Sequence, residues 1–286
     1  MSVRHLFTLL SYLFALSFML GLGLKTPHLD RLIKERDYRL MGRALLANLI
    51  LIPLFGLILQ RVFPMPFDVS LGFLLIAMTP GGLFGLHFAH LSRGNILYAL
   101  KLALVLGLAA TLMLPIMAIV LLPATVSSGL LDARIFVEMF LFVLCPLWIG
   151  HFVQGRWPTG AMRLARVIWI INPLLFAAQE ILASRIKSLS LHSVGQGTVW
   201  ACVLLVLASW GIGWILGGPG LNRRKVLAID TSMRNVAICW LIAHRSFADS
   251  NIVYAILAFS GVSVPMNFLF ALCTRFVNEK EAEGKT

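Results

Sequence analysis

Nine long apolar segments constrain the fold of this chain more than any other feature. They lie at residues 6–24, 40–60, 68–91, 96–121, 133–154, 163–182, 196–217, 224–245 and 251–277. Each is long enough to cross a bilayer as a helix, which takes about 20 apolar residues. Helices are the expected form because backbone groups in lipid must bond within their own segment. The sequence therefore predicts an all-α polytopic membrane protein with nine transmembrane helices.

The composition leaves little room for anything besides these segments. Of the 286 residues, 59% are hydrophobic and 13% are charged, against about 45–50% and about 25% in soluble domains. This balance excludes a soluble enzyme and a disordered chain. A net charge of +12 and a pI near 10.2 would suggest nucleic-acid binding in a soluble protein. Here the apolar segments make the lipid bilayer the expected partner, and we expect no nucleic acid.

The basic residues indicate how the helices are oriented. Nine crossings put the termini on opposite sides, with six Lys and Arg on the N-terminal side against seventeen on the other. Because basic residues accumulate on the cytoplasmic side, we expect the N-terminus outside and the C-terminus in the cytoplasm, in a bacterial inner membrane. The first segment follows Arg4 as in a signal peptide, but no A-x-A-like cleavage site follows it, so we expect it to be retained.

The segment 68–91 is interrupted near its middle by Thr79, Pro80, Gly81 and Gly82. Proline removes a backbone donor and clashes with the preceding turn, and two glycines adopt dihedral angles that other residues resist. We therefore expect an unwound stretch between two half-helices, which at membrane depth must be buried in protein or line a cavity. The alternative is a proline kink with close glycine packing.

The segment 224–245 carries a polar cluster close to mid-depth, formed by Asp230, Thr231, Ser232, Arg234 and Asn235. An isolated charge at the bilayer centre costs about 2.5–3.5 kcal/mol on insertion scales. One interpretation is a structural ion pair between Asp230 and Arg234 on one helix face. The interpretation that we favour is a substrate or ion path, because hydroxyls and an amide accompany the charges. Two interrupted helices in matching positions are typical of secondary transporters.

Four stretches of the chain resemble the motifs of a known transporter family. They are Met19 to Asp30; Asn48 with Pro53; Thr79 to Gly82 followed by Arg93-Gly94-Asn95; and Asp230 to Asn235 after Arg224-Lys225. These look like G-L-x-L-x-x-x-D/F, Q-F-x-x-M-P, C-P-G-G-T-A-S-N with R-G-N/D, and E-V-G-M-Q-N. The sequence thereby resembles the bile acid:sodium symporter family, whose members carry organic anions with sodium.

This resemblance implies a specific fold. Members of the family have two inverted five-helix repeats, arranged as a panel domain and a core domain, with two unwound helices that cross at the ion sites. Some members lack the first helix and have nine, which is the variant that this sequence looks like. We then expect a single transmembrane transporter domain over 1–286, with approximate halves 1–131 and 132–286.

The departures from the family pattern concern sodium. At the four positions that supply side-chain oxygens to the first family site, this chain has Gly85, Leu86, Ala99 and Ala103. None of these offers the side-chain oxygen that a hard cation prefers. At the second site the resemblance places Asn48 and Asp230 as a remnant sodium site, with Arg234 beside them. Because two cations repel in a low-dielectric site, we expect that Arg234 replaces the bound cation, neutralises Asp230 and fixes the crossover.

Other polar residues have two interpretations each. His87 and His90 lie on one face after the first interruption, and Glu138 and Glu180 lie toward the outer ends of their helices. These four are either structural or form a proton relay, since histidine titrates near neutrality. The resemblance places Asn267 near the substrate cavity, and an interhelical hydrogen bond is its alternative role.

We expect a secondary transporter that moves small or amphipathic organic anions by alternating access, with sodium coupling in question. Its expected substrate and ion site comprises Asn48, Thr79, Pro80, Gly81, Gly82, Asp230, Thr231, Ser232, Met233, Arg234, Asn235 and Asn267. We expect no enzyme and no cofactor, because the chain lacks an ATP-binding loop of the G-x-x-x-x-G-K-[ST] type and a catalytic constellation. The alternatives are a sodium-independent or proton-coupled facilitator or exporter, and a non-transporting receptor or scaffold with the same fold.

Overall fold

The computed structural model of the chain describes residues 3–25, 37–82, 84–121, 133–186, 194–246 and 251–277. These residues form helices and, within the described ranges, no strand. The elements are α1 (Val3–Leu24), α3 (Tyr38–Leu46), the π-helix η1 (Ala47–Leu51), α4 (Ile52–Val62), α5 (Phe67–Met78), α6 (Gly85–Leu91), α7 (Ile96–Leu121), α9 (Ala133–Arg156), α10 (Pro158–Ile186), α12 (Gln196–Leu216), α13 (Leu221–Ser232), α14 (Val236–Ser246) and α15 (Ile252–Arg275). The all-helical prediction is confirmed at this level.

Four stretches of the described chain are long and apolar enough to cross a membrane, as expected of a polytopic membrane protein. They are Tyr38–Val62, Pro158–Leu182, Gln196–Leu216 and Ile252–Arg275. The outer surfaces of α4, α9, α10 and α12 expose large apolar side chains such as Leu54, Phe152, Leu174 and Ile215. Such surfaces suit a lipid environment, because lipid tails are as apolar as these side chains.

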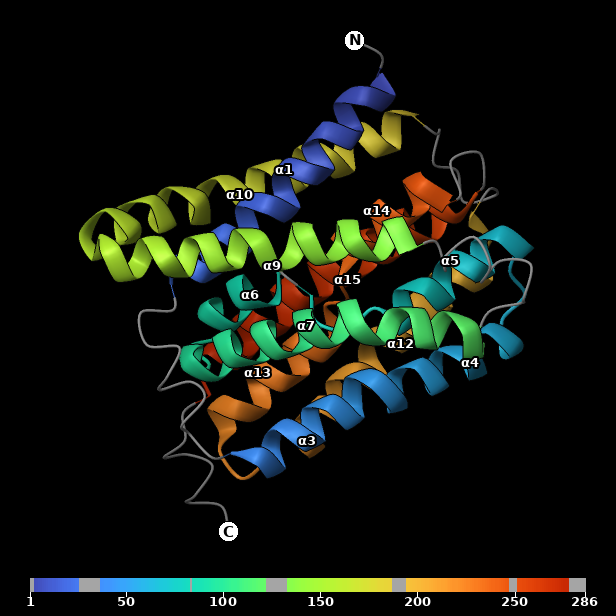
Figure 1. The fold of residues 1–286 in the computed structure, drawn as a ribbon. Coiled ribbons are helices and arrows are strands. Elements are labelled where there is room, and N and C mark those ends of the chain that lie inside the picture. Colours follow the sequence, from blue (N-terminus) through green and yellow to red (C-terminus); the bar gives the residue numbers. More distant parts are fainter. Residues whose placement is uncertain are drawn as a thin grey trace.

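The helices lie in two groups (Figure 1). In the first, α1 packs along both α9 and α10, at the top of Figure 1. Close approach of α1 and α9 depends on Gly23 and Gly150: a Cβ at either position would overlap the backbone of the other helix. Small residues permit such contacts between membrane helices. We call α1, α9 and α10 the first layer, and α3 to α7 with α12 to α15 the second layer.

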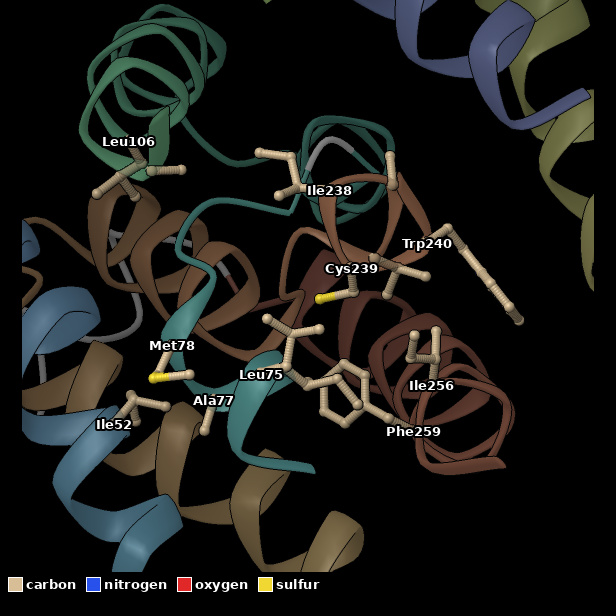
Figure 2. Close-up of a cluster of buried hydrophobic side chains, with 14 of the residues drawn as sticks. Ile52, Leu75, Ala77, Met78, Leu106, Ile238, Cys239, Trp240, Ile256 and Phe259 are labelled. Atoms are coloured by element: carbon tan, nitrogen blue, oxygen red, sulfur yellow. The ribbon is translucent and has the colours of Figure 1, made fainter. Parts of the chain in front are cut away.

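The helix α5 lies at the centre of the second layer. All its residues from Val69 to Met78 are buried, which is the pattern of a helix surrounded by other helices. Figure 2 shows side chains of α4, α5, α14 and α15 gathered around its C-terminal end, among them Ile52, Met78 and Phe259. The end of α5 therefore lies inside the protein rather than against lipid.

Two of the expected helices are interrupted. The segment 68–91 forms α5 and α6, and between them Thr79 is extended and Gly81 has a positive φ of 74°, which glycine adopts readily. The segment 224–245 forms α13 and α14, with Met233 extended between them. The segment 40–60 forms a longer stretch than expected, with a π-helical turn in its middle.

Candidate functional site

The two interruptions lie directly against each other. The Asn235 N–H donates to the Thr79 carbonyl oxygen at 3.3 Å, and the Thr79 hydroxyl lies 2.9 Å from the Cys239 sulfur. Gly82 faces the backbone carbonyl of Met233 so closely that a Cβ there would overlap it. Backbone atoms of the two unwound stretches therefore contact each other directly.

The side chain of Arg234 leaves the second interruption and ends at the first. It is 1% exposed. Its Nη2 donates to the Ala77 carbonyl at 2.7 Å and its Nε to the Ile76 carbonyl at 3.3 Å. These carbonyls belong to the last turn of α5, where the helix dipole is negative. The Ile76 carbonyl also accepts from the Thr79 N–H at 3.1 Å. The guanidinium therefore caps the broken end of α5.

Asn48 completes the environment of this guanidinium. Its Oδ1 accepts from Arg234 Nη1 at 2.8 Å, and its carbonyl accepts from Nη2 at 3.2 Å. Its Nδ2 donates to the Ala44 carbonyl at 3.1 Å and to Thr231 Oγ1 at 3.4 Å. Asn48 lies in the π-helical turn η1, ahead of Pro53, which lacks the N–H that a regular helix would use. Such turns are frequent at functional sites.

Asp230 is buried at the end of α13, but it is not paired with Arg234. Its Oδ2 has no hydrogen-bond partner in the described part of the chain, where no ion pair within 4 Å joins it to Arg234. The alternative interpretation, a pair on one helix face, is wrong, because α13 ends at Ser232 and the guanidinium turns toward α5. What remains is a longer-range attraction between the two charges.

Asn267 is fully buried and joins three helices. Its Oδ1 accepts from Ser232 Oγ at 2.6 Å and from Trp210 Nε1 at 3.0 Å, and its Nδ2 donates to the Ser263 carbonyl at 2.8 Å. It thus connects α15 to α13 and α12. All these bonds are to protein, which is the interhelical role that the sequence left open.

A narrow pocket lies between the two layers, beside the second interruption. Its volume of about 10 Å³ is the room that one water molecule needs. The unpartnered Asn235 Nδ2 and Ser263 Oγ are fully buried polar atoms of residues on its wall. The remaining wall residues are Phe14 of α1, Phe176 of α10, Phe84, Met233, Arg234, Val236, Ala237 and Val264. The lining therefore combines three aromatic rings that pack on one another with the polar side chains of Arg234, Asn235 and Ser263.

His87 and His90 have different surroundings. The ring of His87 stacks on that of Trp169 in α10, with centroids 3.8 Å apart, and His87 Nε2 lies 3.2 Å from the Trp169 carbonyl oxygen. On this tryptophan the ammonium of Lys25 lies 3.3 Å from the ring centroid. Burial lowers the pKa of Lys25 to about 8, so this cation–π contact weakens as the pH rises through 8. His90 is exposed.

The two glutamates with a structural or a relay interpretation lie in α9 and α10. Glu180 accepts a hydrogen bond from Trp240 Nε1 of α14 at 3.3 Å. The backbone of Glu138 lies in α9, but its side chain falls outside the described part of the structure. Among the described residues, no group of three or more His, Cys, Asp or Glu is placed to hold a metal ion.

A family model described as the Sodium Bile acid symporter family matches residues 10–208. The chain belongs to this family. It is 24% identical to the human P3 protein, over 90% of this chain and 56% of that protein. It is 22% identical to the probable sodium/metabolite cotransporter BASS2, chloroplastic, of Oryza sativa subsp. japonica (81% and 55%), and 24% identical to the sodium/bile acid cotransporter 5 of Rattus norvegicus (70% and 47%). The chain spans about half the length of these relatives.

Several contacts in the structure of this symporter-family chain have no signal in its sequence. The carbonyls of Ile76 and Ala77 carry no sequence signal, because every residue has a carbonyl. Lys225, at the start of the predicted segment 224–245, counts in the sequence only as one of the basic residues on the cytoplasmic side. In the structure it lies in α13, is 1% exposed and donates to the Val277 carbonyl at 2.7 Å. A cation just past the end of α15 satisfies free carbonyls there. Its position in the basic run 223–225 gives no indication of this role.

Proposed function

We propose that this chain is a secondary transporter of small or amphipathic organic anions that works by alternating access without sodium. Its family and the names of its cotransporter relatives support transport. The observation that carries the sodium independence is the buried guanidinium of Arg234 among the oxygens of Asn48, Ile76 and Ala77.

The oxygens around Arg234 are of the kind that a hard cation would bind. Three are backbone carbonyls and one is an amide oxygen, which are typical ligands of such ions. A sodium ion placed 4 Å from the guanidinium would be repelled by about 4 kcal/mol at an effective dielectric constant of 20. The guanidinium then serves as a permanent occupant of the cation position.

The first sodium site of the family is also without side-chain ligands here. The resemblance places it at Gly85, Leu86, Ala99 and Ala103, which are all buried. No side chain at these positions can donate an oxygen to a cation. Both family sites thus argue against sodium as the driving ion.

The pocket between the layers suits an anion with an apolar body. Asn235 Nδ2 and Ser263 Oγ are unpartnered donors in the described structure, and the N-terminus of α14 adds partial positive charge. Phe14, Phe84 and Phe176 offer an apolar surface in the same pocket. Because the pocket has room for about one water, the two layers must separate to admit a substrate.

The layers correspond in this proposal to the panel and core of the family fold. The first layer, α1, α9 and α10, is the panel, and the second layer is the core with its two crossing interrupted helices. The whole chain then forms one transporter domain of nine transmembrane helices with inverted halves 1–131 and 132–286. The proposed orientation has the N-terminus outside and the C-terminus in the cytoplasm of a bacterial inner membrane, following the positive charges.

Transport into proteoliposomes tests this function. We use three strongly acidic anions that do not cross lipid unaided: taurocholate, benzenesulfonate and isethionate. We expect uptake of at least one, at the same initial rate with and without a sodium gradient. Binding of radioactive sodium is expected to be absent. Sodium-stimulated uptake that is lost in Asp230→Asn would overturn the proposed sodium independence, and no uptake of any organic anion would overturn transport.

A further inference from the structure

Glu180 is an acidic side chain at the boundary between the two layers. It belongs to α10 of the first layer and accepts a hydrogen bond from Trp240 of α14 in the second. Trp240 is 1% exposed and also packs edge-on against Phe7 of α1, with ring centroids 4.6 Å apart. The carboxyl group is thus held at an interface that must open during alternating access.

The hydrogen bonds around Glu180 match a protonated carboxyl group. Trp240 offers a donor, and its N–H can only donate. The Ser260 hydroxyl of α15 also interacts with the carboxyl, while its own hydrogen is used for the Ile256 carbonyl at 2.9 Å. Ser260 Oγ is therefore available as an acceptor. One donor and one acceptor complement the C=O and O–H of a carboxylic acid.

No cation in the described part of the chain compensates a negative charge on Glu180. Glu180 is half-buried, and the polar groups recorded beside its carboxyl are the Trp240 N–H and the Ser260 hydroxyl. The other titratable groups described on the facing elements are Tyr12 of α1, Cys239 of α14, and Tyr254, Cys273 and Arg275 of α15. Cys273 and Arg275 lie more than three helical turns from Ser260, toward the other end of α15. Tyr12 stacks on Phe142 and Cys239 contacts Thr79. An ionised Glu180 without a compensating cation would be costly between membrane helices.

We propose that Glu180 is a proton-binding site that couples anion movement to the proton gradient. The inference rests on the proposed transport function. The carboxylate takes a proton from hydronium on one side, leaving water, and the neutral acid is accepted between the layers by Trp240 and Ser260. Separation of the layers breaks these bonds and exposes the acid, which returns the proton to water on the other side. One proton thus crosses with each cycle.

Asp230 is the competing carboxyl group, and its position distinguishes it from Glu180. It lies in the second layer together with Arg234, whose charge attracts it. Gly85, its close neighbour on α6, belongs to the same layer. Movement between the layers leaves these surroundings unchanged. Only the carboxyl group whose partners lie across the interface senses the movement directly.

Infrared spectroscopy of the full chain in lipid nanodiscs tests proton binding without any substrate. We expect a protonated-carboxyl C=O band that disappears as the pH rises and is absent in Glu180→Gln. Trp240→Phe keeps the band but shifts it to higher frequency, because the C=O loses its donor. If Glu180→Gln does not fold, Glu180→Asp serves instead, and a displaced band is expected. A band unchanged in these variants, or lost in Asp230→Asn instead, would overturn the assignment.

Uptake in proteoliposomes tests the coupling. An inside-alkaline gradient is expected to raise the initial uptake of the transported anion several-fold in the wild type. Glu180→Gln is expected to retain exchange of labelled for unlabelled anion but to lose this stimulation. Stimulation that persists in Glu180→Gln, or is absent in the wild type, overturns the coupling. If none of the three anions moves, the transport proposal fails, and the infrared titration alone decides whether Glu180 binds a proton.

Discussion

The two interrupted helices reach the same meeting point with opposite chemistry. The first interruption follows a helix that is buried on every side and contributes backbone: the carbonyls of Ile76 and Ala77 and the close approach at Gly82. The second contains neither proline nor glycine between Ser232 and Val236, and it contributes the charged side chain of Arg234. The first supplies acceptors and space, and the second supplies donors and charge.

This difference shows that symmetry of shape does not require symmetry of chemistry. The negative end of α5 needs a cation, and in this chain that cation comes from the partner interruption. Each interruption is therefore stabilised by the other rather than by its own sequence. Substitutions on the two sides should consequently differ in kind and in size.

Removal of the Arg234 guanidinium is expected to have the largest effect on stability. Arg234→Met keeps most of the side-chain volume but removes the donor of the Ala77 carbonyl and one donor of the Ile76 carbonyl. It also leaves Asp230 without a nearby cation. We expect a loss of about 3–5 kcal/mol of stability, measured by thermal unfolding in detergent. Arg163→Met, an exposed position in α10, is the control and should change stability by less than about 0.5 kcal/mol. Equal effects would contradict the role of Arg234.

The next largest effect is expected at Gly82, where the first interruption approaches the backbone of the second. Gly82→Ala places a methyl group on the Met233 carbonyl, and backbone cannot move aside as a flexible side chain can. We expect a loss of about 1–3 kcal/mol in the same unfolding measurement. Gly85→Ala is the matched control, since its nearest neighbour would lie 3.5 Å away in ordinary contact. A destabilised Gly85→Ala beside an unaffected Gly82→Ala would refute the close crossing.

Asn48 lies between the two interruptions and should give an intermediate effect. Asn48→Ala removes one acceptor of Arg234 and the donor to Thr231, which we expect to cost about 1–2 kcal/mol. Asn48→Asp keeps an acceptor for the guanidinium, and its bond is charge-assisted, so we expect a smaller loss. Chemical unfolding in a mild detergent compares the two variants. A larger loss in Asn48→Asp would mean that the amide donor matters more than the acceptor.

The smallest expected effect concerns the hydroxyl of Thr79. Thr79→Val removes its bonds to the Leu75 carbonyl at 2.9 Å and the Ile76 carbonyl at 3.0 Å, at a cost of about 1 kcal/mol. Thr79→Ser retains the hydroxyl and should stay within about 0.5 kcal/mol of the wild type. Both are read from the unfolding midpoint. If Ser and Val lowered it equally, the methyl group rather than the hydroxyl would be the important part.

Much of this arrangement could be predicted from local sequence. Pro80 and the glycines at 81 and 82 predict the first interruption because they restrict or free the backbone directly. The position of Arg234 at membrane depth predicts that it has partners, since an unpartnered charge there is costly. Its orientation could not be predicted, because its acceptors are backbone carbonyls about 157 residues away. The alternative interpretation of a close pair with Asp230 failed for this reason.

Other features depend on contacts that no local pattern carries. The bonds of Asn48 to Thr231 and Arg234 join residues more than 180 positions apart in the sequence. Trp240 reads as one more apolar residue in the sequence, and only the packing of α14 against α10 shows that its N–H reaches Glu180. The burial of Lys225 depends likewise on where α15 ends.

The guanidinium of Arg234 is joined covalently to the chain that it stabilises. A diffusible ion occupies its site according to its concentration, whereas a tethered group has an effective concentration fixed by geometry. The crossing of the two helices therefore has no vacant state that dilution could populate. The stability of this crossing should therefore be the same at low and at high sodium concentration, because no dissolved cation has to occupy it.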